Sequence, residues 1–160
     1  MTVNSKRLSI ITSEYWKDHA MVALNEKLRE IQEGKAEPPG IVKTLGMTVV
    51  QFGEGKSKIK MRVDERYHNP MGTLHGGIMT DLADASMGVA LMSLLNNEES
   101  FTTLELKINF LRPVYDGEIS AEATVVHKGR TVALVESIVR SEEGKEVARA
   151  TATQMILHPK

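Results

Sequence analysis

The chain has 160 residues, of which 26% are charged, and its formal net charge is −1. This length and ordinary composition predict one globular domain with a reasonable hydrophobic core. The balanced charge gives no electrostatic reason to expect nucleic acid or a membrane surface as a partner, and the lack of cysteine excludes disulfides, thiolate metal sites and cysteine nucleophiles.

The first fourteen residues, MTVNSKRLSIITSE, contain no apolar run long enough for a signal peptide or a membrane span. We therefore expect a cytoplasmic protein that makes no contact with a membrane.

A helix from Glu14 to Glu33 is the first predicted element. Ser13 is a suitable N-cap residue, and Gly34 is a typical helix end. The apolar residues keep helical spacing and form one stripe: Trp16, Ala20, Ala23, Leu24, Leu28 and Ile31. Such a stripe predicts a helix packed on the body of the domain. The stretch Glu37-Pro38-Pro39-Gly40 then predicts a turn.

Two strands are predicted next, from Thr44 to Phe52 and from Lys56 to Val63, joined by a glycine-containing hairpin turn. The second strand alternates strictly between basic and apolar side chains: Lys56, Lys58, Lys60 and Arg62 on one face, Ile59, Met61 and Val63 on the other. This alternation predicts a half-buried antiparallel strand with a solvated outer face.

A long apolar helix is predicted from Ile78 to Leu95, with a length of about 27 Å at about 1.5 Å per residue. Its apolar residues fall on every side, so we expect it to be buried all round. Asp81 and Asp84 lie inside it. A carboxylate in a buried helix is unfavourable unless a partner satisfies it or the chemistry uses it. The search for a site therefore starts here.

Four further strands are predicted: Phe101 to Leu111, Glu118 to His127, Thr131 to Arg140 and Lys145 to Leu157. Antiparallel strands around one central helix indicate an α+β fold. The simplest packing is a curved sheet wrapped around the long helix. We expect residues 1–40 to be a helical extension and residues 41–160 to form the main domain.

The loop before the long helix contains bare backbone at Gly72, Gly76 and Gly77. Free N–H groups at a helix N-terminus hold negative charge, including that of a carbonyl oxygen during acyl transfer. The alternative is that the glycines only let the loop turn, and His75 beside them either orients a neighbour or packs.

The two acids lie close to this loop on the helix surface. Asp84 follows Gly77 by seven residues and so shares its face, and Asp81 lies about 60° around the helix from Asp84. Either carboxylate could act as base or nucleophile in a hydrolysis, or one could be structural.

Other site classes find little support in the sequence. The spacing of His68, His75, Asp81 and Asp84 matches no closed metal site, and there is no GxSxG, P-loop or GxGxxG motif. We expect neither a metal nor a cofactor. The residues alone thus lead to a carboxylate-dependent acyl-transfer site.

The pattern Asn69-x-x-Gly72-x-x-His75-Gly76-Gly77, followed by Leu82-Ala83-Asp84, resembles the PaaI-like acyl-CoA thioesterases of the hotdog fold. The stretches NFLRPV (109–114) and VHKGRTVALVES (126–137) are also similar to that family. The resemblance covers about residues 41 to 157 and leaves the leading helix unexplained.

The resemblance implies a hotdog fold, with dimers joined edge to edge through the strand from Phe101 to Leu111 and paired again into tetramers. It also implies an active site between two protomers. Asp84 matches the catalytic acid of the family, and Gly77 matches the residue whose N–H polarises the thioester carbonyl. Asn69 and His75 match polar residues beside the thioester. Thr103 matches a serine that positions water, with Thr102 as a rival.

Coenzyme A would require cations for its phosphates, and Lys128, Arg130 and Arg112 are the candidates, with ordinary surface charge as the alternative. Together with Gly76 they complete the expected substrate-binding residues. We expect an acyl-CoA thioesterase acting on an aryl-acetyl or short- to medium-chain acyl-CoA. The alternatives are a non-catalytic acyl-CoA sensor and an acyl-chain hydratase or dehydratase.

Overall fold

The computed structural model describes residues 22–96 and 98–158. Helix α2 spans Val22–Gln32, and Gly34 after it takes the left-handed conformation with φ 70°, as expected of a glycine helix end. Residues 13–21, where the helix was predicted to begin, lie outside the described residues.

The prediction for the next segment was wrong, because a short helix replaces the first part of the expected strand. Helix α3 spans Gly40–Leu45, and strand β1 begins only at Thr48. Pro39 precedes the helix with φ −53°, a value that suits helix initiation, and Gly46 ends it in the left-handed region with φ 64°. The Pro-Pro-Gly turn therefore opens a helical turn rather than a strand.

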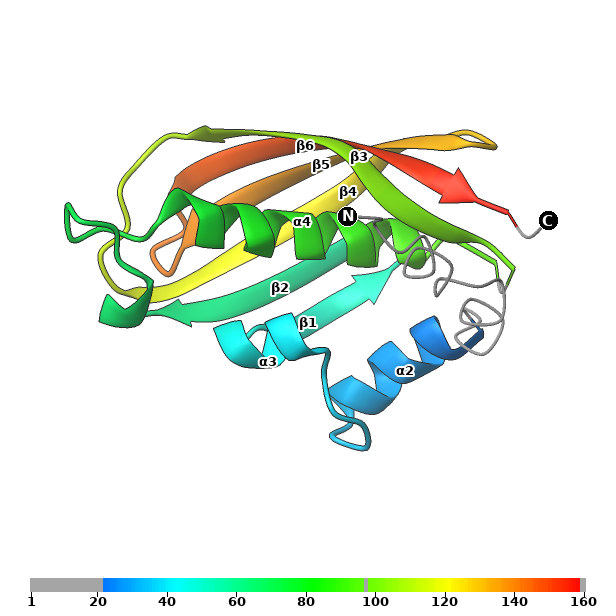
Figure 1. Cartoon of the computed structure of the whole chain (residues 1–160), viewed down its shortest axis with the longest axis horizontal. Helices are drawn as coiled ribbons and strands as arrows, with labels where there is room; N and C mark the ends of the chain where they lie inside the picture. The colour runs from blue at the N-terminus through cyan, green and yellow to red at the C-terminus, as the bar shows by residue number, and fades with distance from the viewer. Residues whose placement is uncertain (1–21, 97, 159–160) are drawn as a thin grey trace, which may run out of the picture.

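Six antiparallel strands form one sheet in the order β1-β2-β4-β5-β6-β3 (Figure 1). Their bounds are β1 Thr48–Gly53, β2 Lys56–Val63, β3 Ser100–Phe110, β4 Gly117–Lys128, β5 Val132–Ser141 and β6 Glu146–Leu157. Apart from the start of β1, each lies within a residue or so of its prediction, because the period-2 patterns and glycine turns define them. Strand β3 lies at one edge of the sheet, with one side free of strand partners.

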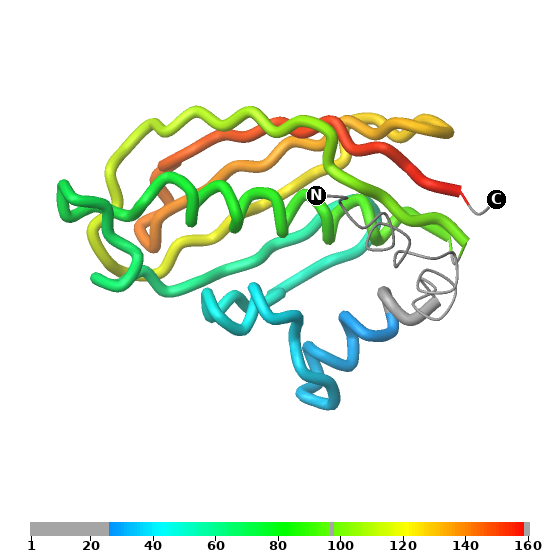
Figure 2. Tube along the Cα trace, in the orientation of Figure 1, coloured from blue at the N-terminus to red at the C-terminus, as the bar shows by residue number. Residues whose placement is uncertain are grey.

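Helix α4 spans Gly76–Met92 and lies along the concave side of the sheet, which curves around it (Figures 1 and 2). Its buried side chains, including Leu82 and Met87, meet the inward residues of the strands. The inward face of β6 carries three alanines, Ala148, Ala150 and Ala152, which let the helix approach closely. The expected hotdog architecture, a sheet wrapped around one long helix with an additional N-terminal helix, is confirmed.

Two expectations about the long helix were wrong. It ends at Met92 rather than at Leu95, and it is not buried all round. Gly77 and Asp81 are exposed in the single chain, whereas the opposite side and the C-terminal half are buried. The sheet covers only one side of a helix, so a face near the helix N-terminus remains open.

A buried group of hydroxyls joins the helix to the sheet. Ser57 of β2 donates to the Ser86 carbonyl oxygen at 2.6 Å, and the Ser86 and Ser137 hydroxyl oxygens lie 3.0 Å apart. All three side chains are buried. These hydrogen bonds satisfy polar groups inside the core and fix the position of α4 against β2 and β5.

Candidate active site

The loop before α4 is held by the side chain of Asn69. Its Oδ1 accepts hydrogen bonds from the N–H groups of Met71 at 2.9 Å and Thr73 at 3.3 Å, and its Nδ2 donates to Thr73 Oγ1 at 2.9 Å. Gly72 in the same loop has φ 76°, which favours glycine. Asn69 thus fixes the path by which the chain enters the helix.

His75 is the N-cap residue of α4. Its Nδ1 accepts a hydrogen bond from the Gly77 N–H at 2.9 Å, so the neutral ring carries its proton on Nε2. The Gly76 N–H has no acceptor within the described part of the chain. The helix therefore begins with one free N–H and one that an exposed imidazole accepts.

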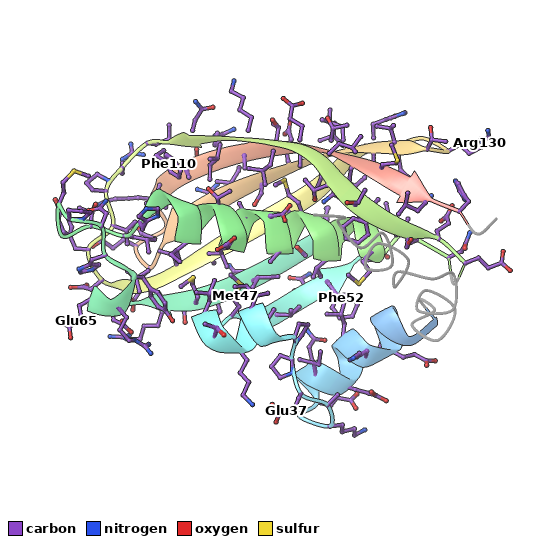
Figure 3. All side chains as sticks on the ribbon, viewed as in Figure 1. Glu37, Met47, Phe52, Glu65, Phe110 and Arg130 are labelled. Carbon is purple, nitrogen blue, oxygen red and sulfur yellow. The ribbon has the colours of Figure 1, made fainter. Side chains whose placement is uncertain are left out.

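Gly76 also lies against an aromatic ring. A Cβ atom at this position would lie 2.8 Å from Cζ of Phe110, at the end of β3. A glycine here lets the strand end and the helix N-terminus approach each other. Figure 3 shows Phe110 beside this end of α4.

Asp84 is half-buried on α4 and hydrogen-bonded to the sheet. Thr103 Oγ1 donates to Asp84 Oδ1 at 3.0 Å, and Gln154 Nε2 donates to Thr103 Oγ1 at 3.3 Å. Of the two threonines considered from the sequence, Thr103 contacts the acid, whereas Thr102 is exposed. The structure thus brings together a carboxylate, a hydroxyl and an amide from three elements.

Asp81 is exposed one turn earlier on the same helix. Partial desolvation, and secondarily the neighbouring Asp84 carboxylate, raise the pKa of Asp81 above its ordinary value. No hydrogen-bond donor among the described residues contacts its carboxylate. The two acids therefore differ in environment, and only Asp84 is oriented by the sheet.

The helix N-terminus and the Asp84 carboxylate of one chain are not adjacent. Seven residues separate Gly77 from Asp84, which places them about 10 Å apart along the helix axis. A base and an oxyanion donor each act from about 3 Å. One chain therefore carries both kinds of group, but two turns apart.

The expected phosphate-binding cations are dispersed. Lys128 lies 3.5 Å from the largely buried carboxylate of Glu99, and Arg112 donates to the Glu146 carbonyl oxygen. Arg112 also lines a surface hollow of about 610 Å³ that includes neither Asp84 nor Gly77. Arg130 is exposed on the β4–β5 hairpin, at the opposite end of the molecule from Phe110 (Figure 3). Lys128 and Arg112 are therefore each engaged by another group of the same chain.

Other classes of site gain no support from the described residues. They contain no group of three His, Asp, Glu or Cys side chains that could hold a metal ion, and no helix long and apolar enough to cross a membrane. His68, one of the residues weighed as a ligand, instead places Nε2 2.6 Å from the Tyr115 carbonyl oxygen.

Gln154 was missed in reasoning from the sequence, although the pattern contains a signal. Alternate positions of the last strand face inward, and Gln154 is the one polar residue among the alanines and Ile156. A polar side chain at an inward position indicates a specific partner.

Known proteins similar to this chain include esterases and acyl-CoA thioesterases. The sequence model of the thioesterase superfamily matches residues 71–148. The chain is 32% identical over 137 residues to a Saccharolobus solfataricus protein named "Putative esterase SSO2140", covering 86% of this chain and 97% of that protein. It is 29% identical to human acyl-coenzyme A thioesterase 13, covering 84% and 97% of the two chains. The structure of a phenylacetic acid degradation-related protein from Ralstonia eutropha superimposes with a TM-score of 0.73 at 29% identity, covering 80% of this chain and 98% of that chain.

Proposed function

The chain belongs to the thioesterase superfamily and is a thioester hydrolase; we propose that it hydrolyses an acyl-CoA to the free acid and coenzyme A. In this proposal the Asp84 carboxylate is the general base or the nucleophile. The observation that carries the proposal is the half-buried Asp84, whose Oδ1 accepts the Thr103 hydroxyl at 3.0 Å on the helix that begins with Gly76 and Gly77.

The acyl group we propose is aryl-acetyl or short- to medium-chain. The name of the Ralstonia eutropha relative, which refers to phenylacetic acid degradation, supports the aryl-acetyl choice. The name of the human relative, an acyl-coenzyme A thioesterase, supports coenzyme A as the leaving group.

In the proposed reaction, Asp84 either removes a proton from water or attacks the carbonyl carbon directly. Thr103 donates to Oδ1, which leaves Oδ2 for the reacting group. The carbonyl oxygen gains negative charge as the tetrahedral intermediate forms, and backbone N–H groups at the helix N-terminus stabilise it. Collapse of the intermediate expels the thiolate of coenzyme A. If water was the nucleophile, the free acid is formed in this step; if Asp84 was the nucleophile, an acyl–Asp84 anhydride remains, which water hydrolyses to the free acid and Asp84. A thiolate is stable near neutral pH, so no strong general acid is required, and no metal or cofactor enters the reaction.

The Gly77 N–H donates to His75 Nδ1 in the free chain. Binding of the substrate carbonyl would therefore require the N–H to share its proton between two acceptors, or the His75 ring to turn away. The ring is exposed, which leaves room for that movement.

We assign the complete active site to two subunits joined through the edge strand β3. The separation of about 10 Å between Gly77 and Asp84 along one helix supports this assembly, because a single thioester cannot readily be held by both groups of one chain. In the proposed dimer, the helix N-terminus of one subunit faces Asp84 of the other. The open face of α4 at Gly77 and Asp81 would then be covered by the partner.

The position of Arg130, a candidate for binding the coenzyme A phosphates, also favours a site between subunits. Arg130 lies at the opposite end of its own chain from Phe110, whose ring lies against Gly76, so it would serve a site at Gly76 only in an assembly (Figure 3). Residues 41–160 form the catalytic domain in this proposal. Within the described part of the extension, Gln32 Nε2 donates to the Val49 carbonyl oxygen of the sheet at 3.1 Å.

The test compares Asp84→Asn with Asp81→Asn, a matched change one turn away. We expect Asp84→Asn to lower kcat by at least about 100-fold, the lower range for loss of a general base. Asp81→Asn should retain wild-type turnover because no hydrogen bond from the described residues orients its carboxylate, whereas Thr103 orients that of Asp84. Full activity in Asp84→Asn, or equal losses in both variants, would refute the assignment of Asp84.

A further inference from the structure

Gln154 is a fully buried polar side chain at a position where the fold requires only an apolar one. Its exposure is 0%, and its inward-facing neighbours along β6 are Ala152 and Ile156. It pairs in register with Thr103 on β3 and with Ala133 on β5. Packing alone would favour an aliphatic residue here, because burying an amide without full hydrogen bonding is unfavourable.

The contacts define the orientation of the Gln154 amide. Thr103 has one hydroxyl proton, which points to Asp84 Oδ1, an oxygen that can only accept when the carboxylate is ionised. The neighbouring Gln154 atom, 3.3 Å from Thr103 Oγ1, must then be a donor, because Thr103 has no second proton to give. The amide therefore presents Nε2 to Thr103, and hydrogen bonds run in one direction from Gln154 through Thr103 to Asp84.

This orientation leaves the other end of the amide unsatisfied. Gln154 Oε1 is buried and has no hydrogen-bond partner among the described residues. An unpaired buried acceptor destabilises the folded state. Such a group in a folded core calls for a reason outside stability.

We propose that Gln154 is a positioning residue for the reaction, which holds the Thr103 hydroxyl as a donor to Asp84. The inference rests on the proposed function, in which the Asp84 carboxylate is the general base or the nucleophile. By filling the Thr103 lone pair, the amide prevents that hydroxyl from turning its proton elsewhere. Asp84 then keeps one oxygen fixed and the other free to act on water.

The main test variant is Gln154→Met, which keeps the length and shape of the side chain but has no amide. We expect kcat to fall about tenfold, the factor that one hydrogen bond of about 1.4 kcal/mol represents. KM should remain unchanged, since Gln154 does not touch substrate.

Thermal unfolding separates positioning from structure. Gln154→Met removes an unsatisfied buried oxygen, so its melting temperature should equal or exceed that of the wild type. Ser137→Ala is the matched control, since Ser137 is also buried on an inward strand face but hydrogen-bonds to Ser86 instead. The control should lower the melting temperature and leave kcat unchanged.

The Thr103→Val background completes the test, because Gln154 acts only through that hydroxyl. In this background Gln154→Met should cause no further loss of kcat. An undiminished tenfold loss there would overturn the inference, as would an unchanged kcat or a lowered melting temperature in the single variant. Asp84→Asn, measured in parallel, distinguishes the two proposals: full turnover in that variant refutes the proposed function itself, whereas its inactivity with a silent Gln154→Met refutes the inference alone.

Discussion

Replacing His75 with alanine tests how the N-terminus of α4 is built. His75 Nδ1 accepts from the Gly77 N–H at 2.9 Å and is the N-cap of a 17-residue helix. Loss of an N-cap side chain costs about 1 kcal/mol, within a range of about 0.5–2 kcal/mol. For a chain of this length, about 1 kcal/mol lowers the melting temperature by about 2–4 °C. We expect a decrease of that size in His75→Ala.

The matched variant is His75→Asn, because a shorter amide oxygen can also accept from an N–H at this position. It should recover most of the lost stability. The assay is thermal unfolding followed by circular dichroism, with both variants at the same pH and protein concentration. A melting temperature in His75→Ala equal to that of the wild type, or an equal loss in both variants, would refute the cap assignment.

Two further perturbations test the packing and electrostatics of the same helix. Leu82→Ala should lower the free energy of unfolding by about 2–5 kcal/mol, because Leu82 is fully buried between helix and sheet. Val126→Ala on the surface should change it by less than about 0.5 kcal/mol. Chemical denaturation measures both changes. Asp81→Asn should raise the melting temperature at neutral pH and have no effect well below pH 3.8, the ordinary value for this carboxyl. The sign follows because the pKa of Asp81 is raised in the fold by burial and by Asp84, so the folded state binds its proton more tightly and ionisation at higher pH is destabilising. A more stable wild type at neutral pH would contradict that sign.

Most of the fold could be predicted from the sequence because its signals are local. Strand β2 was predicted with its observed bounds, Lys56–Val63, since strict alternation and a glycine turn determine it. The start of β1 was not, because a helical turn of six residues after Pro39 leaves no periodic pattern to detect. The exposed side of α4 was also missed, since hydropathy alone cannot show that a sheet covers only one face of an apolar helix.

The candidate site, like the fold, could be predicted only in part from the sequence. The glycines before α4 and the pair Asp81 and Asp84 were recognisable from their types and spacing, whereas the choice of Asp84 and the inclusion of Thr103 came from the family resemblance. Two features were not recognisable, because they depend on contacts between distant segments. The Gly77 N–H is occupied by His75, and Gln154 reaches Thr103 across 51 residues of sequence. The dispersal of Lys128 and Arg112 into contacts with Glu99 and Glu146 likewise required the folded chain.

The most direct measurement is release of free thiol from a panel of acyl-CoA esters, followed with a thiol-reactive dye. The chain contains no cysteine, so the protein itself contributes no background signal. We expect the wild type to release coenzyme A and the free acid from aryl-acetyl or short- to medium-chain esters, and Asp84→Asn to lose most of this turnover. Binding of these esters without any thiol release would contradict the account and indicate an acyl-CoA-binding module instead.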